Sequence, residues 1–264
     1  MLLGGGGALG TGIALILNAL RAAGSMIWTK DGVVMAVSTA GVSGGGPSPL
    51  GQRLNVWLSA ERAVGDLRRY FGIGLPSGVL PFTGSRFEHL AGGGDRLEVA
   101  DRITAEDLVA VQTLSVTVPA SVALDILEGP LGVRLSGLLH AIPKDTDMVD
   151  ADADILADGS PADQAWELLR DQPDVGWVIA GKLLARKRPR LLPVYDRVVR
   201  CAVGRPQSFW LALHDALRED DSAMHRRLIA LRRIAGVPET VSVLRVCDVV
   251  VWMGHRVERH ACPR

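Results

Sequence analysis

The stretch PDVGWVIAGKLLARKRPRLLPVYDRVV, residues 173–199, decides what fold this chain is expected to adopt. It follows an amphipathic segment, ADQAWELLRD (residues 162–171), so two predicted helices are joined by a turn of only a few residues. Gly176 lets the backbone turn closely, and the small side chain of Ala180 lets the two helices approach each other. The stretch therefore predicts a helical hairpin.

Positive charge gathers directly after this hairpin. Seven cationic side chains lie within nineteen residues, and Asp196 is the only acid among them. The cations are Lys182, Arg186, Lys187, Arg188, Arg190, Arg197 and Arg200. The whole chain has 29 basic and 29 acidic residues, so any surface that binds anions has to be local. We expect these cations to contact phosphates; the alternative is a solvated helix end, because cations favour helix C-termini.

The hairpin itself can contribute to phosphate binding. The first amides of a helix have no acceptor within the helix, and the helix dipole attracts anions to that end. The amides around Val175, Gly176 and Trp177 are therefore expected to contact phosphate together with the cations. Duplex DNA is the partner that this combination indicates.

The hairpin resembles the helix-hairpin-helix motif of DNA-repair proteins. That motif has a glycine, an apolar residue, a second glycine, three variable residues and an alanine. Val175, Gly176 and Ala180 match it, and Asp174 stands in place of the first glycine. The resemblance implies a mainly α fold, a helical bundle similar to that of helix-hairpin-helix DNA glycosylases.

The resemblance extends to PVYDRVV, residues 193–199. In these glycosylases a catalytic aspartate follows the hairpin by about twenty residues, and Asp196 lies twenty residues after Gly176. Tyr195 stands between Val194 and Asp196, which shifts the family's register by one position. The resemblance implies that Asp196 is catalytic. It also implies monofunctional base excision, because the position of the nucleophilic lysine is occupied by Val178.

The residues of this segment also allow structural roles. Asp196 could stabilise a developing glycosyl cation and position water, or it could be an ordinary acid of a first helical turn. Tyr195 is a candidate for stacking on a base, as is Trp177, although aromatic residues at helical spacing also pack in cores. The alternative function is a non-catalytic helical module that binds a protein or acts as a scaffold.

The remainder of the chain completes a mainly α domain. Residues 1–53 are a glycine-rich leader with few charges, residues 54–255 are expected to form one helical domain, and residues 256–264 form a tail. LNVWLSAERAVGDLRRYF (residues 54–71) predicts one amphipathic helix, and Thr104 and Ser160 are predicted helix caps.

Several pieces resemble an uncharacterised bacterial family of unknown function across residues 55–254. These pieces are FTGSRFEHLAGGGD, ITAEDLVAVQTLSV, GWVIAGKLLARKRPRLLPVYDRVV and VLRVCDVVVWM. Such a resemblance supplies a domain boundary and implies no activity.

No cofactor or metal is expected. GGGALG, residues 5–10, matches the dinucleotide fingerprint, but no strand precedes it, so we expect no nucleotide cofactor. Cys247, His255, His260 and Cys262 could be zinc ligands, but they include no closely spaced cysteine pair, and Cys247 lies in an apolar helix. Three scattered cysteines and the lack of a full membrane span indicate a cytoplasmic protein that does not enter membranes.

Overall fold

The computed structural model describes residues 28–29, 32–33, 47–58, 62–257 and 262. The chain divides into two compact units, residues 1–46 and 47–264. Within the first unit, β1 (Trp28–Thr29) pairs antiparallel with β2 (Gly32–Val33). The GGGALG motif lies outside the described residues.

The second unit is mainly helical, with no strand among its described residues, and the prediction of a mainly α fold is confirmed. Its first helices are α2 (Pro49–Leu58), α3 (Arg62–Phe71), α4 (Ala105–Gln112), α5 (Ala120–Glu128) and α6 (Pro130–Ala141). The later helices are α7 (Pro161–Arg170), α8 (Trp177–Lys187), α9 (Arg197–Val203), α10 (Phe209–Ala235) and α11 (Val243–Val257). Short 3-10 turns are η1 (Thr83–Arg86), η2 (Leu90–Gly92), η3 (Met148–Asp150) and η4 (Ala153–Ile155). Of these described helices, none combines the length and the apolar character needed to cross a bilayer.

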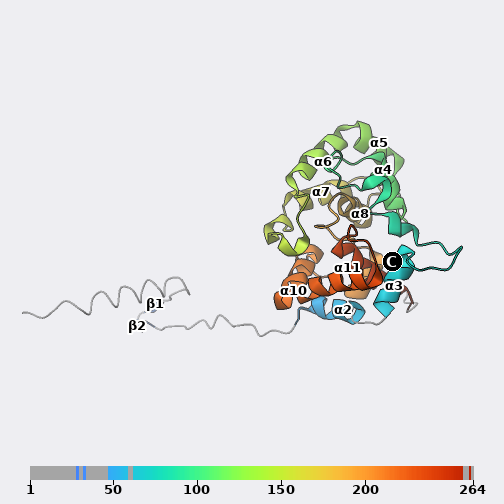
Figure 1. Ribbon diagram of the computed structural model, residues 1–264. Coiled ribbons are helices and arrows are strands. Elements are labelled where there is room, and N and C mark those ends of the chain that lie inside the picture. Colours follow the sequence, from blue (N-terminus) through green and yellow to red (C-terminus); the bar gives the residue numbers. More distant parts are fainter. Residues whose placement is uncertain (1–27, 30–31, 34–46, 59–61, 258–261, 263–264) are drawn as a thin grey trace, which may run out of the picture. The chain divides into compact units, whose positions relative to one another are not determined.

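The helices of this unit pack as two groups (Figure 1). Helix α11 is the centre of one group and packs against α2, α3, α9 and α10. In the other group, α8 packs against α4 and α7, and α6 packs against α5 and α7. One apolar core runs through both groups, from Leu54 on α2 to Val251 on α11.

Helix ends follow the chemistry of the sequence. Ser160 caps α7 by accepting a hydrogen bond from the amide of Asp163 at 3.2 Å, and Pro161 begins the helix. Thr104 and Asp107 form a capping box at the start of α4. Both predicted caps are confirmed.

The predicted helix over residues 54–71 is divided, because α2 ends at Leu58 and α3 begins at Arg62. Helix α10 is kinked between Glu219 and Ser222, where Asp220 and Asp221 have φ angles of 48° and 54°. At this kink the carboxylate of Glu219 accepts a hydrogen bond from the amide of Ser48 at 3.1 Å. The kink therefore ties α10 to the residues just before α2.

Three consecutive cations at the end of α8 lie inside the protein. Arg186, Lys187 and Arg188 each have 0% exposure. Asp107, also at 0%, accepts from Arg186 Nε at 2.9 Å and from Lys187 Nζ at 2.8 Å. One buried carboxylate on α4 therefore neutralises much of the charge of two cations on α8.

The same cations organise a segment that has little regular structure, residues 83–103. Arg186 donates to the carbonyl oxygens of Phe87, Glu88 and Leu90 at 2.5–2.6 Å, and Lys187 donates to that of Val99 at 2.8 Å. At Gly94 a Cβ atom would come within 2.5 Å of the Arg186 carbonyl oxygen and 2.8 Å of Asp107 Oδ1. The glycine is therefore required by the close approach of this segment to α8.

Arg186, Lys187, Arg188 and Asp107 form a buried charge cluster, and Arg188 connects it to a third region of the chain. It donates to the carbonyl oxygens of Ala100 at 2.7 Å and Ile142 at 3.0 Å, and its guanidinium pairs with Asp101 at 2.9 Å. A further hydrogen bond reaches the carbonyl of Leu139. Arg188 thus connects the end of α8 with the irregular segment and with the end of α6.

These contacts correct two sequence-based expectations. Arg186, Lys187 and Arg188 were expected to contact phosphates or, alternatively, to end α8 in solvent, and both expectations are wrong for these three residues. A fully buried guanidinium or ammonium group whose donors are taken by carboxylates and carbonyls has no surface to offer to a duplex. The charge density instead reflects cross-links within the fold.

Replacing Asp107 tests this interpretation of the cluster. Asp107→Asn keeps the size of the side chain but leaves two buried cations without their shared counter-charge, so it should lower the free energy of unfolding by about 3–5 kcal/mol. Chemical denaturation at neutral pH measures the change, and Glu98→Gln removes an exposed acid of the same irregular segment as a control. Equal stability of the two variants would show that Asp107 does not stabilise the fold through Arg186 and Lys187.

Candidate active site

The turn between α7 and α8 sets the position of the candidate site. Asp174 has a φ of 58°, in the left-handed region that aspartate tolerates better than most residues. Gly176, which was expected to make the close turn, has an extended backbone with φ −74° and ψ 172°. Val175 and Ala180, with exposures of 1% and 0%, anchor the turn in the core.

The start of α8 is open at the hairpin. Gly176 is the N-cap and offers no side chain to the first amides. A Cβ atom at Gly176 would meet nothing within 4 Å, so space remains beside the backbone there. The amide of Val175 donates to the carbonyl of Gln172 at 3.1 Å, which removes Val175 from the expected phosphate contacts. The amides at the start of α8 for which the structure describes no acceptor are therefore those of Gly176, Trp177 and Val178.

A cavity of about 740 Å³ begins at this point. The starts of α8 and α9, one side of α11 and the region around η1 line it. Asp196, Trp177 and Arg197 are all among its lining residues. We refer to this cavity as the cleft.

Asp196 is fixed in the cleft by both of its oxygens. As the N-cap of α9 it accepts hydrogen bonds at Oδ1 from the amides of Val198 at 3.0 Å and Val199 at 3.1 Å. Its Oδ2 lies 3.3 Å from Lys182 Nζ, and 15% of the Asp196 side chain is exposed. These three contacts hold the carboxylate in one orientation.

Lys182 is a positioning partner for Asp196. It is only 4% exposed, and it also donates to the carbonyl of Leu114 at 2.9 Å. Burial lowers the pKa of Lys182, and the negative charge of Asp196 partly offsets this effect. Lys182 therefore belongs to the wall of the cleft, but it is almost wholly buried there.

A second carboxylate, Asp248 on α11, also lines the cleft. Its Oδ2 accepts from Arg245 at 2.5 Å, whereas its buried Oδ1 has no partner in the described structure. Burial raises the pKa of Asp248 to about 7, against the opposing charge of Arg245, and the negative charge of Asp196 adds to the rise. Both carboxyl groups in the cleft thus have a cationic partner, and burial brings the pKa of the second, Asp248, close to neutrality.

Arg245 connects Asp248 to the wall of the cleft. It donates to the carbonyl of Gly84 in η1 at 3.0 Å and to the hydroxyl of Tyr70 on α3. At Gly84 a Cβ atom would collide with that hydroxyl. The glycine is therefore needed for η1 to approach α3 and α11.

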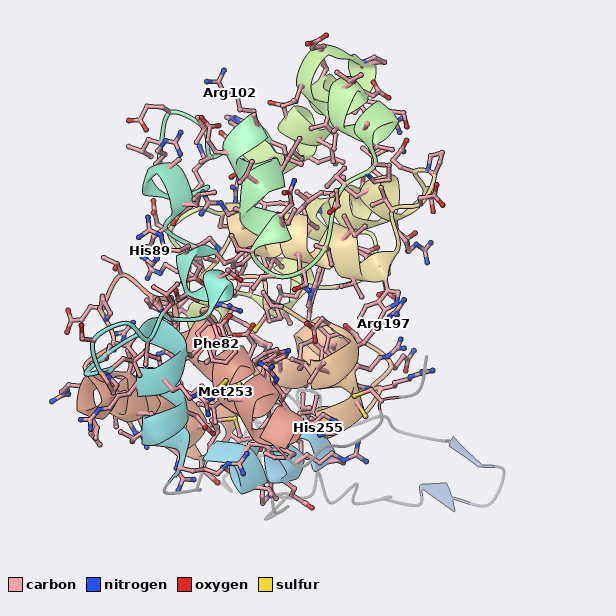
Figure 2. All side chains as sticks on the ribbon, turned by 90° about the vertical axis from the view of Figure 1, so that its right-hand side faces the viewer. Phe82, His89, Arg102, Arg197, Met253 and His255 are labelled. Atoms are coloured by element: carbon pink, nitrogen blue, oxygen red, sulfur yellow. The ribbon has the colours of Figure 1, made fainter. Side chains whose placement is uncertain are left out.

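Aromatic rings form part of the same wall. Tyr70 and Phe82 are stacked with ring centroids 5.3 Å apart and an interplanar angle of 6°, and Trp252 meets Phe82 edge-on at 5.7 Å. The guanidinium of Arg256 lies over the Phe82 ring at 5.3 Å. Phe82 and Arg197, both labelled in Figure 2, line the cleft. The cleft can therefore receive a flat ring near aromatic faces and cationic groups.

Three further predicted site residues also lie outside the cleft. Tyr195 stacks on Phe209 with centroids 3.8 Å apart and donates from its hydroxyl to the carbonyl of Gly204 at 2.6 Å. Tyr195 and Arg200 line a separate cavity of about 440 Å³, which also includes Trp177. Arg190 is exposed and pairs with Asp147 at 2.8 Å. Tyr195 therefore does not share the cleft with Asp196.

Asp248 and Arg245 escaped prediction from the sequence. Both stand in VLRVCDVVVWM, a run of otherwise apolar residues, and they are three positions apart on one helix face. The sequence feature that could have identified them is an opposite-charge pair at this spacing inside an apolar helix, because buried charges require a nearby partner.

The comparisons with known proteins identify one family. Residues 63–255 match the model of a family described as "Family of unknown function (DUF6308)". No curated protein matches the chain, and neither does any solved structure. The likeness to helix-hairpin-helix DNA glycosylases gains no support from these comparisons.

The raised pKa of Asp248 gives a testable pH dependence. Its pKa rises from 3.8 to about 7, so between these values the folded chain holds a proton that the unfolded chain has released. The stability that this proton contributes is complete below pH 3.8 and is lost as the pH rises through about 7.

Asp248→Asn removes this titration. We expect the free energy of unfolding of the original chain, minus that of the variant, to fall by about 3 kcal/mol between about pH 5 and pH 8. Urea unfolding of both proteins across this range measures the difference. A difference that stays constant or increases with pH would contradict the assignment.

Proposed function

This chain belongs to that family of unknown function, and we propose that it is a DNA-binding protein whose cleft receives a base turned out of the duplex and hydrolyses its N-glycosidic bond. One arrangement carries the proposal: Asp196 shares a single cleft with the open start of α8 and with the exposed cation Arg197. A structural acid of a first helical turn has no need of such surroundings.

The size and lining of the cleft suit a nucleoside. Its volume of about 740 Å³ lies within the range of small-molecule sites. Phe82 and Trp252 give its wall an aromatic character, with the Arg256 guanidinium over both rings, and aromatic side chains are common in the pockets of enzymes that extrude bases. The amides of Trp177 and Val178 are placed to meet the negative phosphate that accompanies the base.

The two carboxyl groups suit the two charges that develop in glycosidic hydrolysis. As the C1′–N bond breaks, its electron pair moves to the base and positive charge develops on the sugar. Asp248, with a pKa of about 7, supplies a proton to the departing base. Asp196 stabilises the sugar cation, water adds to C1′, and the proton that the water releases restores the acid form of Asp248.

A non-catalytic helical module is the second candidate, and one observation favours it. Both oxygens of Asp196 already have partners within the protein, Oδ1 with two amides and Oδ2 with Lys182. In that case the ion pair serves to hold α9 on α8, and the cleft has no reaction to perform. The two experiments below separate these candidates.

The first experiment measures binding to duplex DNA. The double variant Arg197→Ala, Arg256→Ala removes two exposed cations at the cleft. The slope of log affinity against log salt should therefore decrease by about 0.9 for each phosphate that the protein no longer neutralises. Fluorescence anisotropy titrations at several salt concentrations give the slope.

Arg102→Ala is the matched control, because Arg102 is an exposed cation labelled at the far end of the fold from α11 in Figure 2. We expect the control to keep the original slope. Equal slopes for all three proteins, or no affinity for duplex DNA, would remove the DNA-binding proposal.

The second experiment measures chemistry. A panel of duplexes with alkylated, oxidised or deaminated bases should include one from which the chain releases the free base and leaves an intact abasic strand. Asp196→Asn should slow release by about 10²- to 10⁴-fold, because a neutral amide cannot stabilise the sugar cation, while DNA affinity is kept.

Release should also decline as the pH rises through about 7, where Asp248 loses its proton. Strand scission by alkali detects the abasic product. The catalytic proposal fails if no duplex in the panel yields a free base, or if Asp196→Asn releases it at the original rate.

A further inference from the structure

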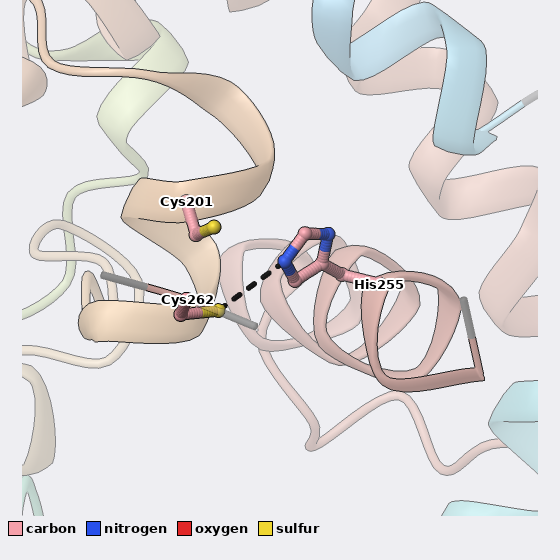
Figure 3. A group of neighbouring side chains, drawn as sticks. All are labelled: Cys201, His255 and Cys262. Atoms are coloured by element: carbon pink, nitrogen blue, oxygen red, sulfur yellow. Dashed lines mark hydrogen bonds between the residues drawn. The ribbon is translucent and has the colours of Figure 1, made fainter. Parts of the chain in front are cut away.

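A group of metal-ligating side chains lies outside the cleft. Cys201 belongs to α9, His255 to the last turns of α11, and Cys262 to the tail. One ligand atom from each lies within 4.8 Å of the other two, and Figure 3 shows the three side chains converging from separate parts of the chain. Within the described residues, this is the group of at least three such side chains that could hold a metal ion.

We propose that Cys201, His255 and Cys262 bind one zinc ion. Two thiolates and an imidazole form a donor set that suits zinc, whereas calcium and magnesium prefer oxygen ligands. His255 is only 5% exposed, and the two cysteines are partly buried, so the site is shielded from most of the solvent. Water completes the coordination of the ion.

The distances fit this assignment. His255 Nε2 lies 3.3 Å from Cys262 Sγ. Zinc bonds of about 2.3 Å to sulfur and about 2.0 Å to nitrogen, at a tetrahedral angle, place such atoms roughly 3.6 Å apart. The observed separation therefore needs only a small change to accept an ion, and the 4.8 Å limit on the other pairs requires a side-chain movement of about 1 Å.

Two of the proposed zinc ligands lie on the helices that carry the carboxyl groups of the cleft. Cys201 lies five residues after Asp196 on the short helix α9, and His255 lies seven residues after Asp248 on α11. A zinc ion would hold the two helices that carry the carboxylates together, and would fix the tail to both. The site is thus structural, and it does not depend on the proposed DNA chemistry.

The structure also corrects the ligand set considered from the sequence. Cys247 is 5% exposed in the core of α11, and burial raises its thiol pKa to about 12. It is not part of the group, and Cys201 stands in its place. His260 lies outside the described residues.

Metal analysis of the full chain tests the proposal. The protein is purified under reducing conditions, stripped with a chelator, reloaded with zinc and freed of excess metal. We expect about one equivalent of zinc per chain by elemental analysis. With cobalt in place of zinc, thiolate-to-metal absorption and the bands of a tetrahedral ion should appear.

Matched cysteine variants then assign the ligands. Cys201→Ser and Cys262→Ser should each weaken zinc binding by at least about tenfold and reduce the thiolate absorption of the cobalt form. Cys247→Ser changes a cysteine outside the group and should keep the full equivalent. Because Cys262 lies in the tail, its variant should retain the circular dichroism of the folded chain.

Three results would overturn the proposal. The first is a reloaded chain that holds less than about one tenth of an equivalent of zinc. The second is equal zinc affinity in Cys201→Ser, Cys262→Ser and Cys247→Ser. The third is a Cys201–Cys262 disulfide, detected by intact mass and peptide mapping, that persists in the reduced preparation and prevents metal uptake.

Discussion

The cations that end α8 hold the fold together. Arg186, Lys187 and Arg188 have no exposed surface, and their donors reach Asp107, Asp101 and backbone carbonyls of the segment that precedes α4. The backbone hydrogen bonds within that segment, such as those from Phe87 to Gly84 and from Val99 to Arg96, span only three residues, so its course through the fold follows the positions of these three side chains. Its far end reaches η1, where Gly84 accepts from Arg245 at the wall of the cleft. The cleft therefore depends on contacts made at both ends of the segment.

Burial of so much charge is not an efficient way to gain stability. Removing each ion from water costs several kcal/mol, and a well-packed apolar replacement is often equally stable. The cluster instead determines the conformation of the chain around it, because its donors bond to acceptors at definite positions in the sequence. A segment without regular structure can in this way be given one conformation. This accounts for three of the seven cations in that stretch of the sequence.

Local signals in the sequence predicted the helices, and long-range pairing escaped prediction. Thr104 and Ser160 were identifiable as caps because their bonds span three residues. Arg186 and Arg188 find their carboxylates 79 and 87 residues earlier in the chain, and a basic run after a helix looks the same whether it is buried or solvated. Asp196 was a candidate because it follows the hairpin at the distance that the resemblance implies, whereas Asp248 comes to line the same cleft only when the chain folds.

Hydrogen–deuterium exchange on Arg186→Met tests the role of the cluster most directly. The substitution keeps an apolar stem and removes the donors to Phe87, Glu88 and Leu90. We predict that amides of residues 83–103 exchange at least about tenfold faster than in the original chain, while those of α10 and α11 keep their protection. Unchanged exchange in residues 83–103, or an equal increase in α10 and α11, would contradict the view that these buried cations position the segment.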